Sequence, residues 1–292
     1  MTKPSGDVRM RLLGLVLAVF VLASTPAQAQ LLQWTQQMVG SGPSRRSDHA
    51  TVYDAARGVT VLFGGYTEVS PNWSSDETWE WNGTAWTQRA VTGPSRRWDH
   101  AMAYDAARGV TVLFGGTNGS NSNAETWEWN GTAWTQRVVS GPSARWGHAM
   151  AYDAARGVSV LFGGWDGIGN SGETWEWNGT AWTQRMVSGP PPRYWHEMAY
   201  DAVRGLSILF GGRTIGNTNT SDTWEWDGTV WTQRMVDGPT PRHGHSMAFD
   251  AVRSVIVLIG GSPEIYSYAD TWEWNGAGWT QQVVSGPMAR RN

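Results

Sequence analysis

Histidine and arginine recur along this chain at spacings that could carry chemistry. Five histidines stand 48 to 51 residues apart, and an arginine stands three residues before each of them. Imidazole is the commonest metal ligand in proteins, and a guanidinium fork orients carboxylates or hydroxyls. The pattern therefore suggests a metal site or an anion-binding ring. The residues are His49, His100, His148, His196 and His245, with Arg46, Arg97, Arg145, Arg193 and Arg242.

Catalysis by a nucleophile has little support in the sequence. The chain has no cysteine, so it offers no thiolate nucleophile and no thiolate metal ligand. No Gly-x-Ser-x-Gly elbow occurs. One glutamate recurs at regular intervals and fits a structural strand position: Glu80, Glu128, Glu176, Glu225 and Glu273. Loop carboxylates could still form the pair that glycoside hydrolysis needs, so a hydrolase or lyase stays open as an alternative.

The spacing of these residues follows an internal repeat of about fifty residues. Five glycine pairs, 48 to 51 residues apart, mark it, and no stretch of helical periodicity interrupts it. Such a period is typical of propellers and other repeat architectures. The repeats span about 46–89, 97–137, 145–185, 193–234 and 242–282.

Each repeat predicts four strands, which we call A to D in chain order. In the second repeat they are 100–104, 110–114, 126–129 and 133–136. An Asp-Ala-Ala-Arg-Gly turn joins A to B, and Asn-Gly, a strong hairpin signal, joins C to D. Strand B is apolar on both faces, which a propeller blade wedged between two others requires. The sequence therefore predicts an all-β propeller.

The glycine pair that ends strand B, followed by a tryptophan and by a second one on strand D, resembles the kelch repeat. The resemblance covers nearly all of residues 31–292, and Trp-Glu-Trp on strand C departs from the commonest kelch pattern. It implies four-stranded blades with strand A lining a central channel, the fold of the central domain of galactose oxidase. The copper site of that enzyme needs a cysteine-modified tyrosine, which this chain cannot form. Family membership implies no single function.

The propeller interpretation changes the meaning of the recurring residues. Histidines on five different blades cannot converge on one ion at about 2 Å, so we expect no metal and no cofactor. They are expected to have a hydrogen-bonded structural role and to tie the start of strand A to the neighbouring blade. The arginines remain either structural ion-pair partners or an anion ring. Of the 21 tryptophans, 16 occupy repeat positions and are expected to pack between blades.

The remaining five tryptophans suggest a binding face. Only the B–C loop varies in length, from 12 residues in the first repeat to 9 or 10 in the others. The B–C and D–A connections lie at the same end of each blade, and all five off-pattern tryptophans fall in them. Tyr194 and His243 share the position of Trp98 and Trp146, and Trp73 lies in the first B–C loop. The predicted ligand-binding residues are Trp98, Trp146, Trp165, Tyr194 and Trp195, with Arg97, Arg145 and Arg193 beneath them.

The first 29 residues read as a secretory signal peptide. Lys3, Arg9 and Arg11 form a basic segment, 12–23 is an apolar run, and 27–29 supplies the small residues for cleavage before Gln30. The run is shorter than the roughly 20 residues that cross a bilayer. Cleavage leaves residues 30–292 with a net charge of −5 and argues against nucleic acid as a partner.

The strand count is uneven, because 31–37 reads as an additional strand D ahead of the first complete repeat. Arg290 matches Arg46, so the chain stops where a sixth repeat would begin. We therefore predict five complete four-stranded repeats and an N-terminal D strand. A six-bladed ring that lacks roughly 40 residues would have this arrangement, either with a wide gap or with an unusual five-bladed closure.

These observations favour a secreted, monomeric binding or scaffold protein, periplasmic or extracellular, whose ligand is a glycan or a protein. Two acidic side chains within about 5 to 10 Å of each other in the B–C loops would instead favour the enzyme.

Overall fold

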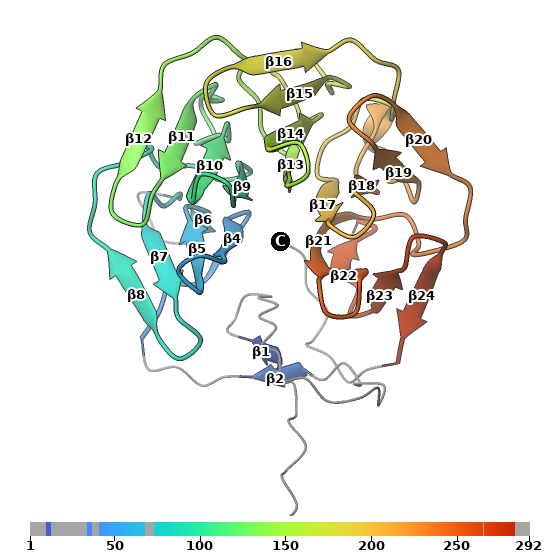
Figure 1. Ribbon diagram of the computed structural model, residues 1–292, viewed down its shortest axis with the longest axis horizontal. Helices are drawn as coiled ribbons and strands as arrows, with labels where there is room; N and C mark the ends of the chain where they lie inside the picture. Colours follow the sequence, from blue (N-terminus) through green and yellow to red (C-terminus); the bar gives the residue numbers. More distant parts are fainter. Residues whose placement is uncertain (1–9, 13–33, 37–40, 68–72, 265, 284–292) are drawn as a thin grey trace, which may run out of the picture.

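Five four-stranded antiparallel sheets are arranged around a central channel (Figure 1). The computed structural model describes residues 10–12, 34–36, 41–67, 73–264 and 266–283. The sheets confirm the predicted all-β propeller with five blades. In each blade strand A lies next to the channel and strand D at the periphery. Within the described residues, no helix is long and apolar enough to cross a membrane.

The blades follow one another in chain order. Blade 1 comprises β4 (Ala50–Asp54), β5 (Val59–Phe63), β7 (Thr78–Trp81) and β8 (Trp86–Arg89). Blade 2 comprises β9 (Ala101–Asp105), β10 (Val110–Phe114), β11 (Thr126–Trp129) and β12 (Trp134–Arg137). Blade 3 comprises β13 (Ala149–Asp153), β14 (Val158–Phe162), β15 (Thr174–Trp177) and β16 (Trp182–Arg185). Blade 4 comprises β17 (Glu197–Asp201), β18 (Leu206–Phe210), β19 (Thr223–Trp226) and β20 (Trp231–Arg234). Blade 5 comprises β21 (His243–Asp250), β22 (Val255–Ser262), β23 (Thr271–Trp274) and β24 (Trp279–Gln282).

The predicted turn chemistry is present at both hairpins of a blade. Asp105 Oδ1 accepts hydrogen bonds from the backbone N–H groups of Ala107 and Arg108, and Gly109 adopts a φ of 66°. Asn130 Oδ1 likewise accepts the N–H groups of Thr132 and Ala133. These side chains satisfy backbone donors that the tight turn leaves unpaired.

Tryptophans at repeat positions join each blade to the one before it. Trp134 Nε1 on strand D donates to Thr78 Oγ1 of blade 1 at 2.9 Å, and Trp129 Nε1 on strand C donates to Glu80 at 3.1 Å. The strand D bond recurs at the next three interfaces, from Trp182 to Thr126, Trp231 to Thr174 and Trp279 to Thr223. The predicted packing between blades is confirmed for Trp129 and for the strand D tryptophans of blades 2 to 5.

The recurring glutamates also have structural partners. Glu80 accepts ion pairs from Arg57 and Arg89, each at 2.5 Å, besides the indole of Trp129. Its side chain is 3% exposed, so the position is a buried, paired carboxylate. Such a carboxylate is fully engaged in joining blade 1 to blade 2.

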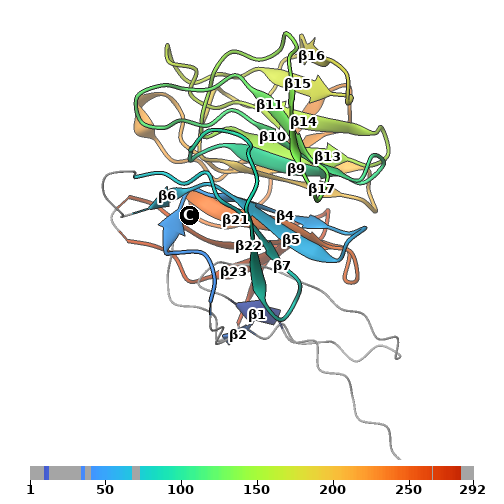
Figure 2. The ribbon, with the colours of Figure 1, turned by 90° about the vertical axis from the view of Figure 1, so that its left-hand side faces the viewer.

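Blades 1 and 5 lie on either side of a sector in which the described residues form only the two-stranded parallel sheet β1 (Met10–Leu12) and β2 (Trp34–Gln36). Figures 1 and 2 both place β1 and β2 at this sector. The additional strand predicted at 31–37 is therefore present over Trp34–Gln36, but it pairs with β1 and not with a blade. A short antiparallel pair joins β3 (Arg46–Ser47), just before strand A of blade 1, to β6 (Tyr66–Thr67), at the start of the first B–C loop.

Of the predicted signal peptide, residues 1–29, the structure describes only Met10–Leu12, so the cleavage prediction lies outside the described residues. The end of the chain, 284–292, on which the sixth-repeat argument depends, also lies outside them.

The hydrogen bond between the strand C threonine and the strand D tryptophan of the next blade predicts that Thr→Val will lower the free energy of unfolding by different amounts at two equivalent positions. Thr126→Val leaves the buried Trp182 indole N–H without an acceptor and should lower the free energy of unfolding by about 1 to 3 kcal/mol. Thr271→Val is the matched control, because the buried Thr271 hydroxyl makes no hydrogen bond within the described residues. Denaturant unfolding measures both. Equal losses would show that the hydroxyl–indole bond does not stabilise the interface.

Candidate functional site

One residue of each blade, directly before the strand A histidine, forms a ring at the channel mouth. These residues share a left-handed backbone, with φ between 53° and 66°. In blades 2 to 5 the residue donates its N–H to the carbonyl of its counterpart in the preceding blade, over 2.7 to 3.1 Å. We call them the mouth residues: Asp48, Asp99, Gly147, Trp195 and Gly244.

Trp195 is the unusual member of this ring. A left-handed backbone is rare for a bulky residue and marks a position held by its surroundings. The Trp195 indole passes over blade 3, and its Nε1 donates to Asp99 Oδ1 of blade 2 at 2.9 Å. Gly147 lies under this path, where a Cβ would be 3.2 Å from the indole. The glycine of blade 3 thus leaves room for the tryptophan of blade 4 to reach blade 2.

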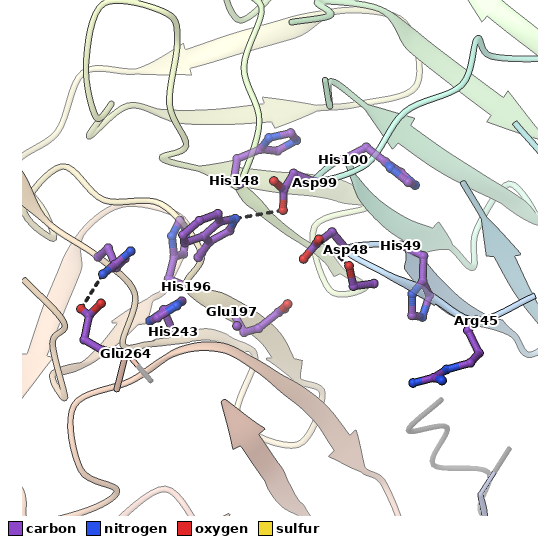
Figure 3. A pocket seen from close by; sticks show the side chains of 15 residues that line it. Arg45, Asp48, His49, Asp99, His100, His148, His196, Glu197, His243 and Glu264 are labelled. Atoms are coloured by element: carbon purple, nitrogen blue, oxygen red, sulfur yellow. Dashed lines mark hydrogen bonds and ion pairs between the residues drawn. The ribbon is translucent and has the colours of Figure 1, made fainter. Parts of the chain in front are cut away.

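The mouth residues line a cavity of about 660 Å³ (Figure 3). Its wall includes four strand A histidines, Glu197, Arg45 and the ion pair between Arg213 and Glu264. A smaller cavity of about 140 Å³ lies deeper in the channel. His49, His100, His148 and Glu197 line both, so they stand where the mouth narrows into the channel.

Two carboxyl groups of the mouth face each other across adjacent blades (Figure 3). Burial and then the neighbouring charge of Asp48 raise the pKa of Asp99 well above its usual range, and the Trp195 hydrogen bond opposes the shift only in part. Asp48 accepts a hydrogen bond from the Ser47 hydroxyl at 2.8 Å. Burial and the charge of Asp48 therefore both favour the protonated carboxyl group of Asp99, which can donate a hydrogen bond.

Glu197 is a third carboxyl group in the channel. Burial raises its pKa to about 8. The corresponding residues of the other blades are Ala50, Ala101, Ala149 and Ser246. The strand does not need a carboxylate at this position, so Glu197 is a candidate functional residue.

The strand A histidines lie at the interfaces between blades. The His100 ring packs edge-on against Phe63 of blade 1, with centroids 5.5 Å apart, and the same contact recurs from His148, His196 and His245 to Phe114, Phe162 and Phe210. Burial and then Arg145 lower the pKa of His148 to about 3, whereas the Phe114 carbonyl has a smaller opposite effect. These imidazoles are neutral at physiological pH. They contact the neighbouring blade as expected, but through ring packing.

The arginines predicted beneath the aromatic residues are buried and form ion pairs within their own blades. The side chains of Arg97, Arg145 and Arg193 are 0% exposed. Each forms an ion pair with the last residue of the B–C loop in its own blade, Glu125, Glu173 or Asp222, at 2.5 to 2.6 Å. Their geometry fits the structural alternative, because no face of the guanidinium is open to a ligand.

The predicted aromatic residues form two groups on the face of the cavity. Trp146, Trp165, Tyr194 and Trp195 contact one another with centroids 4.7 to 6.5 Å apart, and Trp195 stacks on His243 at 5.3 Å. We call these five residues the aromatic cluster. Trp98 belongs to a second group, in which Tyr66 contacts both Trp98 and Trp73. Antiparallel bridges between Trp98 and Thr117 and between Trp146 and Trp165 confirm that D–A and B–C connections meet at this end of the blades.

No known family model matches the chain, and no curated protein matches it at a significant level. The fold therefore rests on the geometry, and the chain is a five-bladed β-propeller. Within the described part of the chain, no three histidine, cysteine, aspartate or glutamate side chains are grouped so that they could hold a metal ion.

Four carboxyl groups that line the cavity were not among the residues that the sequence singled out: Asp48, Asp99, Glu197 and Glu264. Of these, only Glu264 comes from a B–C loop, where a pair of acidic side chains would have favoured the enzyme. Aligning the repeats by position would have indicated Asp48, Asp99 and Glu197. The residue before the histidine reads Asp, Asp, Gly, Trp, Gly, and the residue after it reads Ala, Ala, Ala, Glu, Ser.

The raised pKa of Glu197 predicts a stability change with a definite sign. Between about pH 4.5 and pH 8 the folded protein keeps this proton and the unfolded chain releases it, so stability falls as the pH rises. Glu197→Gln removes this term. The variant should match the wild type at pH 4 and exceed its free energy of unfolding by on the order of 2 kcal/mol at pH 8.5.

Denaturant unfolding at several pH values measures the difference. Asp76→Asn, at an exposed B–C loop carboxylate, controls for loss of one negative charge. A constant difference between Glu197→Gln and wild type across this range would contradict the assignment.

Proposed function

We propose that the chain is an exported, kelch-type binding protein that holds part of a glycan at the mouth of its channel. The kelch assignment is supported by the glycine pair that ends strand B. Gly115 and Gly116 have φ values of 70° and 90°, and a Cβ on Gly115 would lie 2.6 Å from the carbonyl oxygen of Arg145 on the next blade. Only glycine fits such a close approach between blades.

The observation that carries the binding proposal is the double contact of Trp195. This residue belongs to the aromatic cluster and also lines the cavity, where it binds Asp99. The aromatic surface and the polar cavity are therefore continuous. Sugar rings stack on aromatic faces while their hydroxyls form directed hydrogen bonds, and this site offers both kinds of contact.

The charge of the cavity favours a neutral polar ligand. Burial raises the pKa of Asp99 and that of Glu197 and favours their neutral forms, and Arg213 is paired with Glu264. The strand A histidines of the wall are neutral. Neutral carboxyl groups can both donate and accept hydrogen bonds, which matches sugar hydroxyls better than a cation or a phosphate.

Replacing one aromatic residue should separate binding from folding. Trp146 contacts three other members of the aromatic cluster and is only partly buried, so Trp146→Ala should leave the fold intact and weaken oligosaccharide binding by about 1 to 3 kcal/mol. Trp177, 1% exposed and bonded to Glu128 of blade 2, is the control, and Trp177→Ala should cost several kcal/mol of stability.

Calorimetric titration with a set of soluble oligosaccharides and thermal melts test both variants. The proposal fails if Trp146→Ala lowers the melting temperature as much as Trp177→Ala and leaves the affinity unchanged. It also fails if the wild type binds none of the oligosaccharides.

A further inference from the structure

We propose that Glu197 selects sugars that carry an acetamido group, by bonding the amide of that group where the channel mouth narrows. This inference rests on the proposed function, because it takes the same cavity and the same class of ligand. It names the kind of sugar, a neutral acetamido sugar, and the residue that distinguishes it from a sugar with a hydroxyl group at the same ring position.

Glu197 stands between two cavities of different size. Its side chain lines the cavity of about 660 Å³ at the mouth, here called the outer cavity, and also the cavity of about 140 Å³ beyond it, the inner cavity. In Figure 3 its carboxyl group points into the outer cavity. Ligand pockets usually begin at roughly 300 Å³. A sugar ring therefore fits the outer cavity, and only a substituent of that ring fits the inner one, next to Glu197.

The fold does not require a carboxyl group at this position. Three of the other four blades have alanine there, and the fourth has serine. Within the described residues no positively charged side chain compensates Glu197. Burial raises its pKa to about 8, and only the backbone N–H of Met198 opposes this shift. A buried carboxyl group without a charged partner destabilises a fold. Its presence on one blade out of five therefore fits a ligand contact better than a structural role.

The inner cavity offers both kinds of contact that an acetamido group makes. Alanines and three methionines line it beside the hydroxyl groups of Thr51 and Ser246, the alanines being Ala50, Ala101 and Ala149. In each described blade strand A pairs only with strand B, so its channel edge carries backbone N–H and carbonyl groups that have no strand partner. The wall thus has methyl groups for the acetamido methyl and hydrogen-bonding groups for the amide.

The neutral carboxyl group of Glu197 complements an amide. Its O–H can donate to the amide carbonyl, or its carbonyl oxygen can accept from the amide N–H, and the strand edges supply the other partner. A hydroxyl group at the same ring position forms hydrogen bonds but brings no methyl group to the alanine side chains. The acetamido sugar therefore gains apolar burial and an additional hydrogen bond over its hydroxyl counterpart.

Matched sugars isolate the acetamido group. The purified protein is titrated, by calorimetry and ligand-observed NMR, with the methyl α- and β-glycosides of N-acetylglucosamine and glucose and of N-acetylgalactosamine and galactose. Chitotetraose and cellotetraose form a further pair. The members of each pair differ only in an acetamido group in place of a hydroxyl group. At least one acetamido sugar should bind about 10-fold more tightly than its counterpart. De-acetylated chitotetraose, which carries amino groups, should bind more weakly than chitotetraose.

Variants in the wall test the role of Glu197. Glu197→Ala copies the residue of three other blades, so folding should accept it. It should weaken binding of the acetamido sugar by about 10-fold and change the affinity for the hydroxyl counterpart by less than about 2-fold. Glu197→Gln keeps a donor and an acceptor and should retain most of the preference. Ala50→Leu, at a partly buried position of the inner cavity, should remove the preference with Glu197 in place.

Asp76→Asn, at an exposed B–C loop carboxylate, is the charge control and should bind every sugar as the wild type does. Thermal melts show which variants fold. If Glu197→Ala does not fold, Ala50→Leu and Glu197→Gln decide the matter, since the first should lose the preference and the second should keep it.

The outcomes separate this inference from the proposed function. Equal affinities within every pair, or tighter binding of the hydroxyl or amino sugar, overturn the acetamido preference and leave glycan binding standing. A preference that survives Glu197→Ala, or that survives Ala50→Leu where Glu197→Ala does not fold, overturns the role of this narrowing. Absence of binding by every sugar overturns the proposed function together with this inference.

Discussion

The channel mouth depends on one backbone hydrogen bond per blade. From blade 2 to blade 5, the residue before the strand A histidine donates its N–H to its counterpart in the preceding blade, and the left-handed conformation of these residues recurs at each step. Because donor and acceptor are both backbone groups, the contact itself specifies no side chain. The conformation does restrict the choice, since glycine adopts it freely, aspartate tolerates it and tryptophan rarely does. The same five positions line the cavity. The constraint that aligns the blades therefore also decides which residues face a ligand.

The burial of the histidines and arginines explains why carboxyl groups keep their protons at this site. The guanidinium of each arginine that precedes a histidine is paired within its own blade, as Arg145 is with Glu173. Its charge nevertheless helps to keep the adjacent imidazole neutral, as Arg145 does for His148. Apart from Arg45 and from Arg213, which is paired with Glu264, the cavity wall thus supplies little positive charge to compensate an ionised Asp99 or Glu197. Burial then dominates, and both carboxyl groups retain protons well above the pH at which a solvated acid ionises.

The fold could be predicted from the sequence because the same strand and turn residues recur in all five repeats. Strand B of the second repeat was expected at 110–114 and occupies those residues, and strand A was expected at 100–104 and begins one residue later. The aromatic face was predictable too, since length variation and off-pattern tryptophans indicate the same loops. The carboxyl groups were not, because their proximity arises from the ring. Asp48 and Asp99 are 51 residues apart, and Trp195 bonds to Asp99 across an intervening blade. The partner of strand β2 was missed for a related reason: Trp34–Gln36 has the sequence of a strand D but pairs in parallel with Met10–Leu12.

A ring of nearly identical blades can recognise an asymmetric ligand only through the positions at which the blades differ in sequence. Here the departures are distributed unevenly around the channel. Blades 1 and 2 contribute aspartates to the mouth, while blades 3 to 5 contribute the aromatic cluster. Trp195 connects the two sides, because its ring stacks on His243 of blade 5 and its indole nitrogen bonds to Asp99 of blade 2. A ligand in this cavity would meet an aromatic surface on one side and carboxyl groups on the other. A sugar ring has the same division, with apolar faces and hydroxyls along its edge. The five-bladed scaffold therefore has a site in which such a ring would bind in a defined orientation.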